Sequence, residues 1–280
     1  TLDRSSAASD VYKRQGEGRP TSRFTIQSSQ FTIQISQSRL ESCIGPFING
    51  FTEAIRLVFS GDPELAEIVG LSLRVSGIAL LISTVIGIPL GAVLGLNRFR
   101  GKHGVVAVIY TGMAFPPVVV GLVVYLLLSR SGVLGGLNSP WLPTLYTPGA
   151  MILAQVIIAL PLVAGFTMAA VASVDPALRV QVRALGASPW QTAWAILDET
   201  RVGVIAAVVA GFGGIISEVG AVMIVGGNIE GRTRVLTTAI VLETNKGNFA
   251  MAMALGIVLL AIAFLTNFVI LRLQGRSLEP

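Results

Sequence analysis

The sequence predicts an all-α protein that crosses a membrane several times, and three observations support this prediction. Only 12% of the 280 residues are charged, which is about half the usual share in a globular protein. Hydrophobic residues make up 52% of the chain, and its mean hydropathy is +0.75. Long uncharged stretches recur along the sequence, and a hydrocarbon core needs roughly 20 apolar residues per helix. So few charges could not cover the surface of a water-soluble fold.

About five stretches are long enough to cross a bilayer as helices. We expect these spans at about residues 75–97, 104–129, 149–174, 202–227 and 248–271. An amphipathic helix is expected before them, from about Pro46 to Ser60. Glycines and prolines crowd residues 131–148, which indicates a loop that could hold a short re-entrant piece.

The membrane domain is expected to cover residues 46–274, with a C-terminal tail at 275–280. Residues 1–45 are interpreted as a non-native or disordered segment, with a basic arm as the alternative. They contain the near-repeat of Phe24–Gln30 in Phe31–Gln37, and residues 5–15 resemble the translation of a sequencing adapter. These 45 residues therefore carry no prediction about the fold.

The distribution of Lys and Arg predicts the orientation of the spans. If residues 98–103 face the cytoplasm, eight Lys and Arg residues lie on that side and four lie on the other. The loop 131–148 has no charge, which suits the outer face. The C-terminus is then cytoplasmic.

Prolines interrupt the first three spans, at Pro89, Pro116-Pro117 and Pro161. The glycines at 87, 91 and 95 form a ridge of small residues, which allows another helix to approach closely. Two interpretations stay open: kinked packing in an ordinary bundle, or broken helices that line a pathway and move.

Glu218 is the only ionisable residue in the middle of a span, where a charge is costly. Its candidate partners are Arg232 and Arg234. It is either one half of an ion pair that fixes the nearby turn, or part of a translocation path or gate. One cysteine and one histidine exclude an internal disulfide and His-pair zinc motifs.

The segment between the third and fourth spans, residues 175–201, contains two strong helix starts. Asp175-Pro176 supplies an N-cap and a first-position proline, and Gly186 ends that helix. Ser188-Pro189 begins a second helix, in which Gln191 completes a capping box. Trp190, Trp194 and Leu197 share one face, which suits the membrane interface.

Within this segment, Arg183-Ala-Leu-Gly-Ala-Ser-Pro-Trp190 closely resembles the coupling-loop motif of ABC-importer permeases. Two departures stand beside it: Val180-Gln-Val182 replaces the family's Glu-Ala-Ala, and Glu199 occupies an expected proline position. The resemblance implies a type I ABC-importer permease fold. It also implies that the loop contacts an ATPase subunit through Arg183, Ala184, Leu185, Gly186, Ala187 and Ser188.

Further motifs resemble the oxyanion branch of this family, in particular tungstate-type permeases. They are Phe59-Ser-Gly-Asp-Pro-Glu-Leu65, Leu71-Ser-Leu-Arg-Val-Ser76, Phe115-Pro-Pro-Val-Val-Val-Gly121, Ser217-Glu-Val-Gly-Ala221, Gly226-Gly-Asn-Ile229, Thr233-Arg-Val-Leu-Thr-Thr238 and Glu243-Thr-Asn-Lys-Gly-Asn-Phe249. The resemblance implies inward transport of tungstate by alternating access, with molybdate or sulfate as the alternative anion. Cationic and hydroxyl donors suit oxyanions, so the candidate path or gate residues are Glu218, Asn228, Arg232, Thr233 and Arg234.

The implied partners are a second copy of the chain, ABC ATPase subunits, an extracytoplasmic oxyanion-binding protein and the lipid bilayer of a prokaryotic cell (inner) membrane. Nothing indicates nucleic acid. The chain contains no Walker A motif, so ATP and Mg are expected on the ATPase and no cofactor is expected in this chain.

Two other classes remain. A passive channel or an ion-coupled carrier is the second, although a carrier would usually need more intramembrane titratable groups than Glu218 alone. An intramembrane enzyme is the third, and the sequence offers it no paired aspartates, histidine cluster or nucleophile–base pair.

Overall fold

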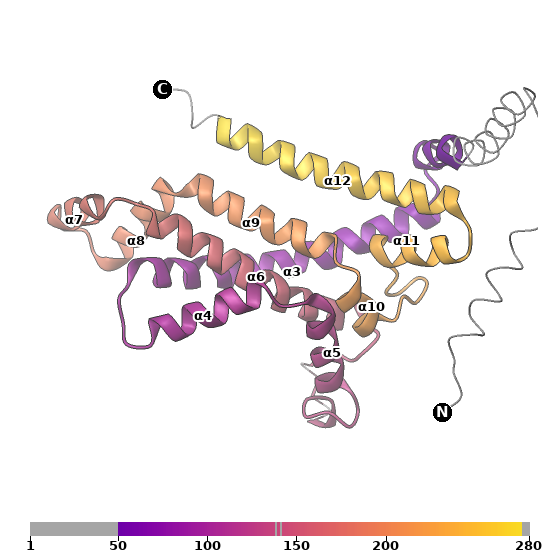
Figure 1. Ribbon diagram of the computed structural model, residues 1–280, viewed down its shortest axis with the longest axis horizontal. Helices are drawn as coiled ribbons and strands as arrows, with labels where there is room; N and C mark the ends of the chain where they lie inside the picture. The colour runs from indigo at the N-terminus through magenta and orange to yellow at the C-terminus, as the bar shows by residue number, and fades with distance from the viewer. Residues whose placement is uncertain (1–49, 138, 141, 276–280) are drawn as a thin grey trace, which may run out of the picture. The chain divides into compact units, whose positions relative to one another are not determined.

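The computed structural model describes residues 50–275 except positions 138 and 141 (Figure 1). All regular elements in this part are helical, which confirms the predicted fold class. After a helical stretch at 50–60, the helices are α3 (Pro63–Leu96), α4 (Lys102–Met113), α5 (Pro117–Leu128), a 3-10 turn η1 (Gly135–Leu137), α6 (Pro148–Ala172), α7 (Pro176–Ala184), α8 (Pro189–Glu199), α9 (Arg201–Ile216), α10 (Gly220–Gly226), α11 (Leu236–Asn245) and α12 (Phe249–Gly275). The interpreted segment 1–45 and most of the tail lie outside the described residues.

Helix α3 begins twelve residues before the expected span. Asp62 caps it by accepting a hydrogen bond from Leu65 N at 3.0 Å, and Pro63 occupies the first position. Arg74, which limited the span in the sequence, lies exposed within the helix. Its 34 residues correspond to about 51 Å of helix, against a hydrocarbon core of about 30 Å. A charged residue therefore ends the apolar stretch without ending the helix.

The glycine ridge of α3 packs directly against α6. A Cβ added at Gly91 would lie 2.5 Å from the carbonyl oxygen of Ala164, and one at Gly95 would lie 2.7 Å from Val171. A Cβ at Gly87 would lie 3.0 Å from Val163. The predicted close helix approach is confirmed, because only glycine leaves room for the α6 backbone.

The helix is broken within two of the predicted spans, 104–129 and 202–227. Pro116 and Pro117 separate α4 from α5, which lie at 103° to each other. Residues 217–219 separate α9 from α10. Three described helices are long and apolar enough to span a membrane. The number rises to five if two bent pairs, α4 with α5 and α8 with α9, each count as one span.

Helix α11 is absent from the sequence prediction, which had a loop between the last two spans. Its sequence carries three threonines, one glutamate and one asparagine in ten residues, so no apolar period marks it. The structure stabilises it by tertiary contacts: Leu236 and Ala239 are buried with Leu65 and Ile68 of α3 and with α12.

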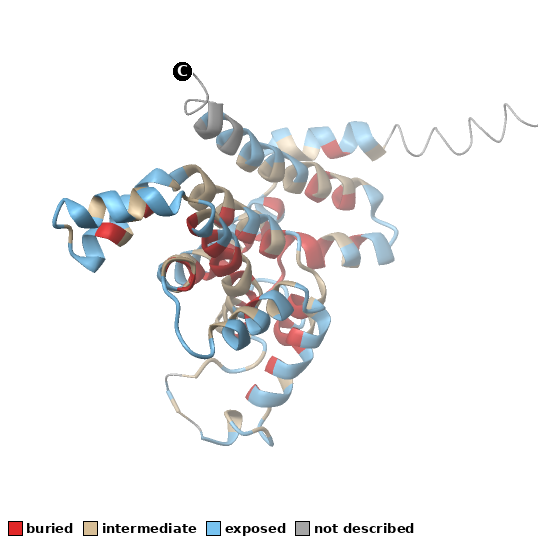
Figure 2. Cartoon of the chain, turned by 60° about the vertical axis from the view of Figure 1, so that its left-hand side comes forward, coloured by how far each residue is buried: buried red, intermediate tan, exposed pale blue. Residues whose placement is uncertain are grey.

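Short helices and their connecting loops form two groups, at opposite ends of α3 and α6 (Figure 1). Helices α7 and α8 lie near the end of α3 at Leu96, whereas α10 and α11 lie towards its beginning. Buried side chains concentrate between these ends (Figure 2), with one cluster shared by α3, α5, α6 and α10. The fold thus places the α7–α8 loop and the α10–α11 turn at opposite ends of the long helices.

Replacement of Gly91 by alanine should destabilise the protein by about 1–3 kcal/mol, because the added methyl group overpacks the α3–α6 contact. Gly77 lies in the same helix with open space around its Cβ position. Gly77→Ala is therefore the matched control, and it should be neutral or slightly stabilising because alanine favours a helix. Thermal unfolding of both variants in detergent measures this difference; equal melting temperatures would contradict the packing.

Candidate functional site

The first candidate region is the helical loop formed by α7 and α8, and its local structure follows the predicted caps. Asp175 Oδ1 accepts a hydrogen bond from Ala177 N at 2.8 Å. Gly186 has a φ of +88°, in the left-handed region, which turns the chain between the two helices. Ser188 N donates to Gln191 Oε1 at 2.8 Å, and Gln191 N donates to Ser188 Oγ at 3.3 Å. The capping box is confirmed.

Arg179 connects this loop to the ends of the two long helices. Its Nη2 donates to the Val171 carbonyl of α6 at 2.7 Å, and its Nη1 donates to the Gly95 carbonyl of α3 at 3.4 Å. Terminal carbonyls of helices lack partners within the helix and carry partial negative charge. A guanidinium that bridges two such ends fixes α7 relative to both helices.

The tip of the loop leaves apolar side chains in solvent. Leu185 is 88% exposed and Val180 is 67% exposed. Arg183, Ala184, Gly186 and Ser188 are also exposed, and Ala187 is half-buried. A rigid, capped loop with an exposed leucine at its turn has the properties of a docking surface.

The second candidate region surrounds the break between α9 and α10. Glu218 Oε1 accepts a hydrogen bond from Ala221 N at 3.0 Å, at the start of α10. Gln155 of α6 donates through Nε2 to the Ile215 carbonyl at 3.2 Å, and Thr237 of α11 donates to the Glu218 carbonyl at 2.8 Å. Side chains from three elements thereby satisfy the backbone that the break exposes.

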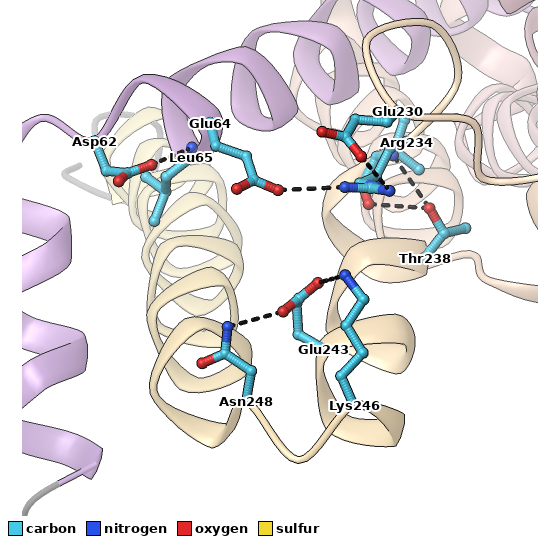
Figure 3. A network of polar contacts seen from close by, with 10 residues as sticks. Asp62, Glu64, Leu65, Glu230, Arg234, Thr238, Glu243, Lys246 and Asn248 are labelled. Atoms are coloured by element: carbon cyan, nitrogen blue, oxygen red, sulfur yellow. Dashed lines mark hydrogen bonds and ion pairs between the residues drawn. The ribbon is translucent and has the colours of Figure 1, made fainter.

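Of the two interpretations of Glu218, the ion pair with Arg232 or Arg234 is not formed in the described part of the chain. Arg234 instead pairs with Glu64 Oε1 at 3.2 Å and Glu230 Oε2 at 3.3 Å (Figure 3). Glu218 forms no ion pair within residues 50–275 as described. The reason is that α3 extends past the predicted span and brings Glu64 close to Arg234, whose side chain is 10% exposed.

The turn that follows α10 is held by Thr233. Its Oγ1 donates to the Gly226 carbonyl at 2.6 Å and accepts from Ile229 N at 2.9 Å. Asn228 has a φ of +52°, and its Oδ1 is buried without a hydrogen-bond partner in the described structure. Arg232 is exposed and forms no ion pair in the described part of the chain. Of the five path candidates, Arg232 therefore offers the accessible cation.

Glu243 and Glu64 are two residues of this region that the sequence prediction did not single out. Glu243 is buried and accepts hydrogen bonds from Lys246 Nζ at 2.7 Å and Asn248 Nδ2 at 2.9 Å (Figure 3). Burial raises the pKa of Glu243, but these two hydrogen bonds outweigh it and hold the pKa below its usual value. The i,i+3 spacing of Glu243 and Lys246 could have indicated this pair. Glu64 lies 170 residues from Arg234 and gives no local signal.

The chain is similar to known proteins over most of its length. Residues 87–277 match the family model described as binding-protein-dependent transport system inner membrane component. The tungstate uptake system permease protein of Peptoclostridium acidaminophilum is 43% identical over 80% of this chain and 96% of its own length. A probable anion ABC transporter permease protein of Haloferax volcanii is 44% identical over 76% and 92%. The tungstate uptake system permease protein of Campylobacter jejuni is 37% identical over 81% and 92%.

Solved structures share the fold at lower sequence identity. A chain of an inward-facing methionine ABC transporter superposes with a TM-score of 0.63 at 20% identity, over 78% of this chain and 97% of that one. A chain of a bacterial alginate ABC transporter, solved in complex with a periplasmic protein, gives a TM-score of 0.65 at 19% identity, over 89% and 95%. These likenesses support the fold alone.

Proposed function

The chain belongs to the family of binding-protein-dependent transport system inner membrane components, and on this premise we propose that it is the permease subunit of an ATP-driven importer of tungstate. The observation that supports the proposal most is the identity of 43% to a tungstate uptake permease over nearly the whole of that relative. The exposed helical loop and the broken helix pair supply the two structural parts that such a subunit needs.

The α7–α8 loop is proposed to dock on an ABC ATPase subunit through Arg183, Ala184, Leu185, Gly186, Ala187 and Ser188. Leu185 supplies the apolar contact, and Gly186 provides the turn that presents it. Arg179 transmits a displacement of the loop to α3 and α6, because it bonds to the terminal carbonyls of both helices. ATP and Mg belong to that partner, and the C-terminus shares its cytoplasmic side.

A second copy of the chain is proposed to complete a central path, with an oxyanion-binding protein on the outer face. The turn after α10 would then lie at the outer mouth. Arg232 offers a cation to the anion, while Thr233 and Arg234 hold the turn as positioning residues. Asn228 and Glu218 flank α10, so a movement of α10 displaces both of them. Alternating access follows if the ATPases move the α7–α8 loops of the two copies together.

The function is tested by measuring cellular tungsten in cells that lack oxyanion uptake and express the chain with its ATPase and binding protein. Tungsten should accumulate only with an active ATPase and should persist in excess molybdate or sulfate. Abolition by either competitor would reassign the anion within the same class. ATPase-independent accumulation would favour an ion-coupled carrier, and no accumulation of any oxyanion would contradict the importer.

Replacement of Leu185 by serine should weaken copurification of the ATPase about tenfold or more, because burying a leucine contributes about 1.5–3 kcal/mol. The stability of the permease should not change, since this side chain is exposed. Val133→Ser is the matched control: Val133 is 78% exposed in the loop before α6. Equal ATPase binding by the two variants would overturn the docking surface.

Replacement of Arg232 by glutamine should lower the tungsten uptake rate about tenfold, because a charge-assisted hydrogen bond contributes about 1.5–3 kcal/mol. Arg232→Lys should retain part of the rate, and Arg130→Gln should leave it unchanged. Arg234→Gln should lower uptake together with the melting temperature, because Glu64 and Glu230 lose their partner. Unchanged uptake in the Lys and Gln variants of both arginines would exclude the outer-mouth assignment.

A further inference from the structure

An open groove of about 800 Å³ lies between the end of α3 and the helices α8 and α9. Its volume falls within the range of about 300–1,000 Å³ that is usual for small-molecule sites. The uncharged stretch of α3 ends at Asn97, which lines the groove and precedes Arg98 and Arg100. The groove therefore lies where the apolar part of α3 meets charged sequence, which is the level of the lipid headgroups.

The walls of the groove are apolar and aromatic. Val93 of α3 is 50% exposed and lies opposite Trp190 and Trp194 of α8. The two indole rings contact each other edge to face, with centroids 5.9 Å apart. Trp190 is 70% exposed, so the protein itself does not cover this surface. Tryptophan prefers the boundary between hydrocarbon and headgroups, because its ring is apolar and its N–H is polar.

Positive charge borders this apolar surface. Arg179, Arg183 and Arg201 line the groove with a single carboxylate, Asp198, so three cations face one anion. Arg183 and Arg201 form no ion pair with any residue that the structure describes. Arg179 uses both Nη atoms on helix carbonyls and leaves a buried Nε without a partner. An occupant should therefore combine a long apolar part with a negative charge.

We propose that the groove binds an anionic phospholipid, with an acyl chain between α3 and the two tryptophans and the headgroup phosphate beside Arg201 and Arg183. Basic pockets between membrane helices bind anionic headgroups by this combination of charge and apolar surface. The bound lipid packs against α3, α8 and α9 together. It thereby links the α7–α8 loop to the lipid composition of the membrane, and the proposal does not depend on which anion is transported.

Quenching of tryptophan fluorescence by brominated lipids tests the site in the full chain. The chain has three tryptophans, so Trp141→Phe leaves Trp190 and Trp194 as the reporters. In phosphatidylcholine vesicles, brominated phosphatidylglycerol should be about thirtyfold more effective than brominated phosphatidylcholine at quenching this fluorescence. The reason is that each of the two unpaired arginines, Arg183 and Arg201, favours an anionic lipid by about 1 kcal/mol. High salt should reduce this preference for the anionic lipid only in part, since the groove shields the contact between the arginines and the headgroup phosphate.

Two variants and one control separate a built site from general attraction to anionic lipid. Arg201→Gln should lower the preference about fivefold, and Val93→Phe should weaken quenching by both lipids because it fills the groove. Arg130→Gln removes the same charge from the loop that follows α5 and should change nothing. Equal quenching by the two lipids, or equal loss in Arg201→Gln and Arg130→Gln, would overturn the proposal.

A further experiment tests the site in the assembled complex. Native mass spectrometry of the permease with its ATPase, in mixed micelles of both lipids, should retain phosphatidylglycerol, and Arg201→Gln should release it. A complex that retains no phosphatidylglycerol, although the isolated chain binds it, would mean that a second copy or the ATPase covers the groove. That result would also overturn the proposal, while leaving the transport function intact.

Discussion

The structure depends on one constraint: backbone groups freed inside an apolar bundle must find partners within the protein. The break between α9 and α10 exposes the carbonyls of Ile215 and Glu218, and Gln155 and Thr237 hydrogen-bond to them. The first N–H of α11 is met in the same way, since Leu236 N donates to Ser72 Oγ at 2.7 Å. The broken helix is therefore stabilised by side chains of α6 and α11, and α11 is in turn held by α3.

Helix α3 contacts both candidate regions, the α7–α8 loop at one end and the turn between α10 and α11 at the other. Arg179 bonds to its last turn, and Arg234 pairs with Glu64 in its first turn. Its length exceeds the uncharged stretch 75–97, so Glu64 lies before that stretch, whereas Gly95 lies close to its end. The α7–α8 loop at one end and the turn between α10 and α11 at the other are therefore both bonded to α3. This attachment gives a physical route between the proposed ATPase-docking loop and the proposed outer mouth.

The sequence is sufficient to predict what local chemistry determines. The caps at Asp175 and Ser188 and the turn at Gly186 follow from neighbouring residues, and the glycine ridge of α3 follows from its spacing. The α9–α10 break and helix α11 could not be predicted, because distant side chains such as Gln155 stabilise them. Counting charges also placed the start of α3 too late, and so the Glu64–Arg234 pair remained hidden.

The contact between α3 and α6 limits how this protein can move. At Gly91 the α3 backbone lies against the α6 backbone, and at Gly95 it lies against the Val171 side chain, so sliding of one helix along the other would drive α3 into α6 side chains. We therefore expect α3 and α6 to move together as one rigid body. Glycines with open space lie outside this contact; at Gly101 and Gly186, for example, a Cβ would meet no atom within 4 Å. Because Arg179 of the α7–α8 loop bonds to the ends of both helices, we expect a displacement of this loop to shift α3 and α6 together instead of deforming either one.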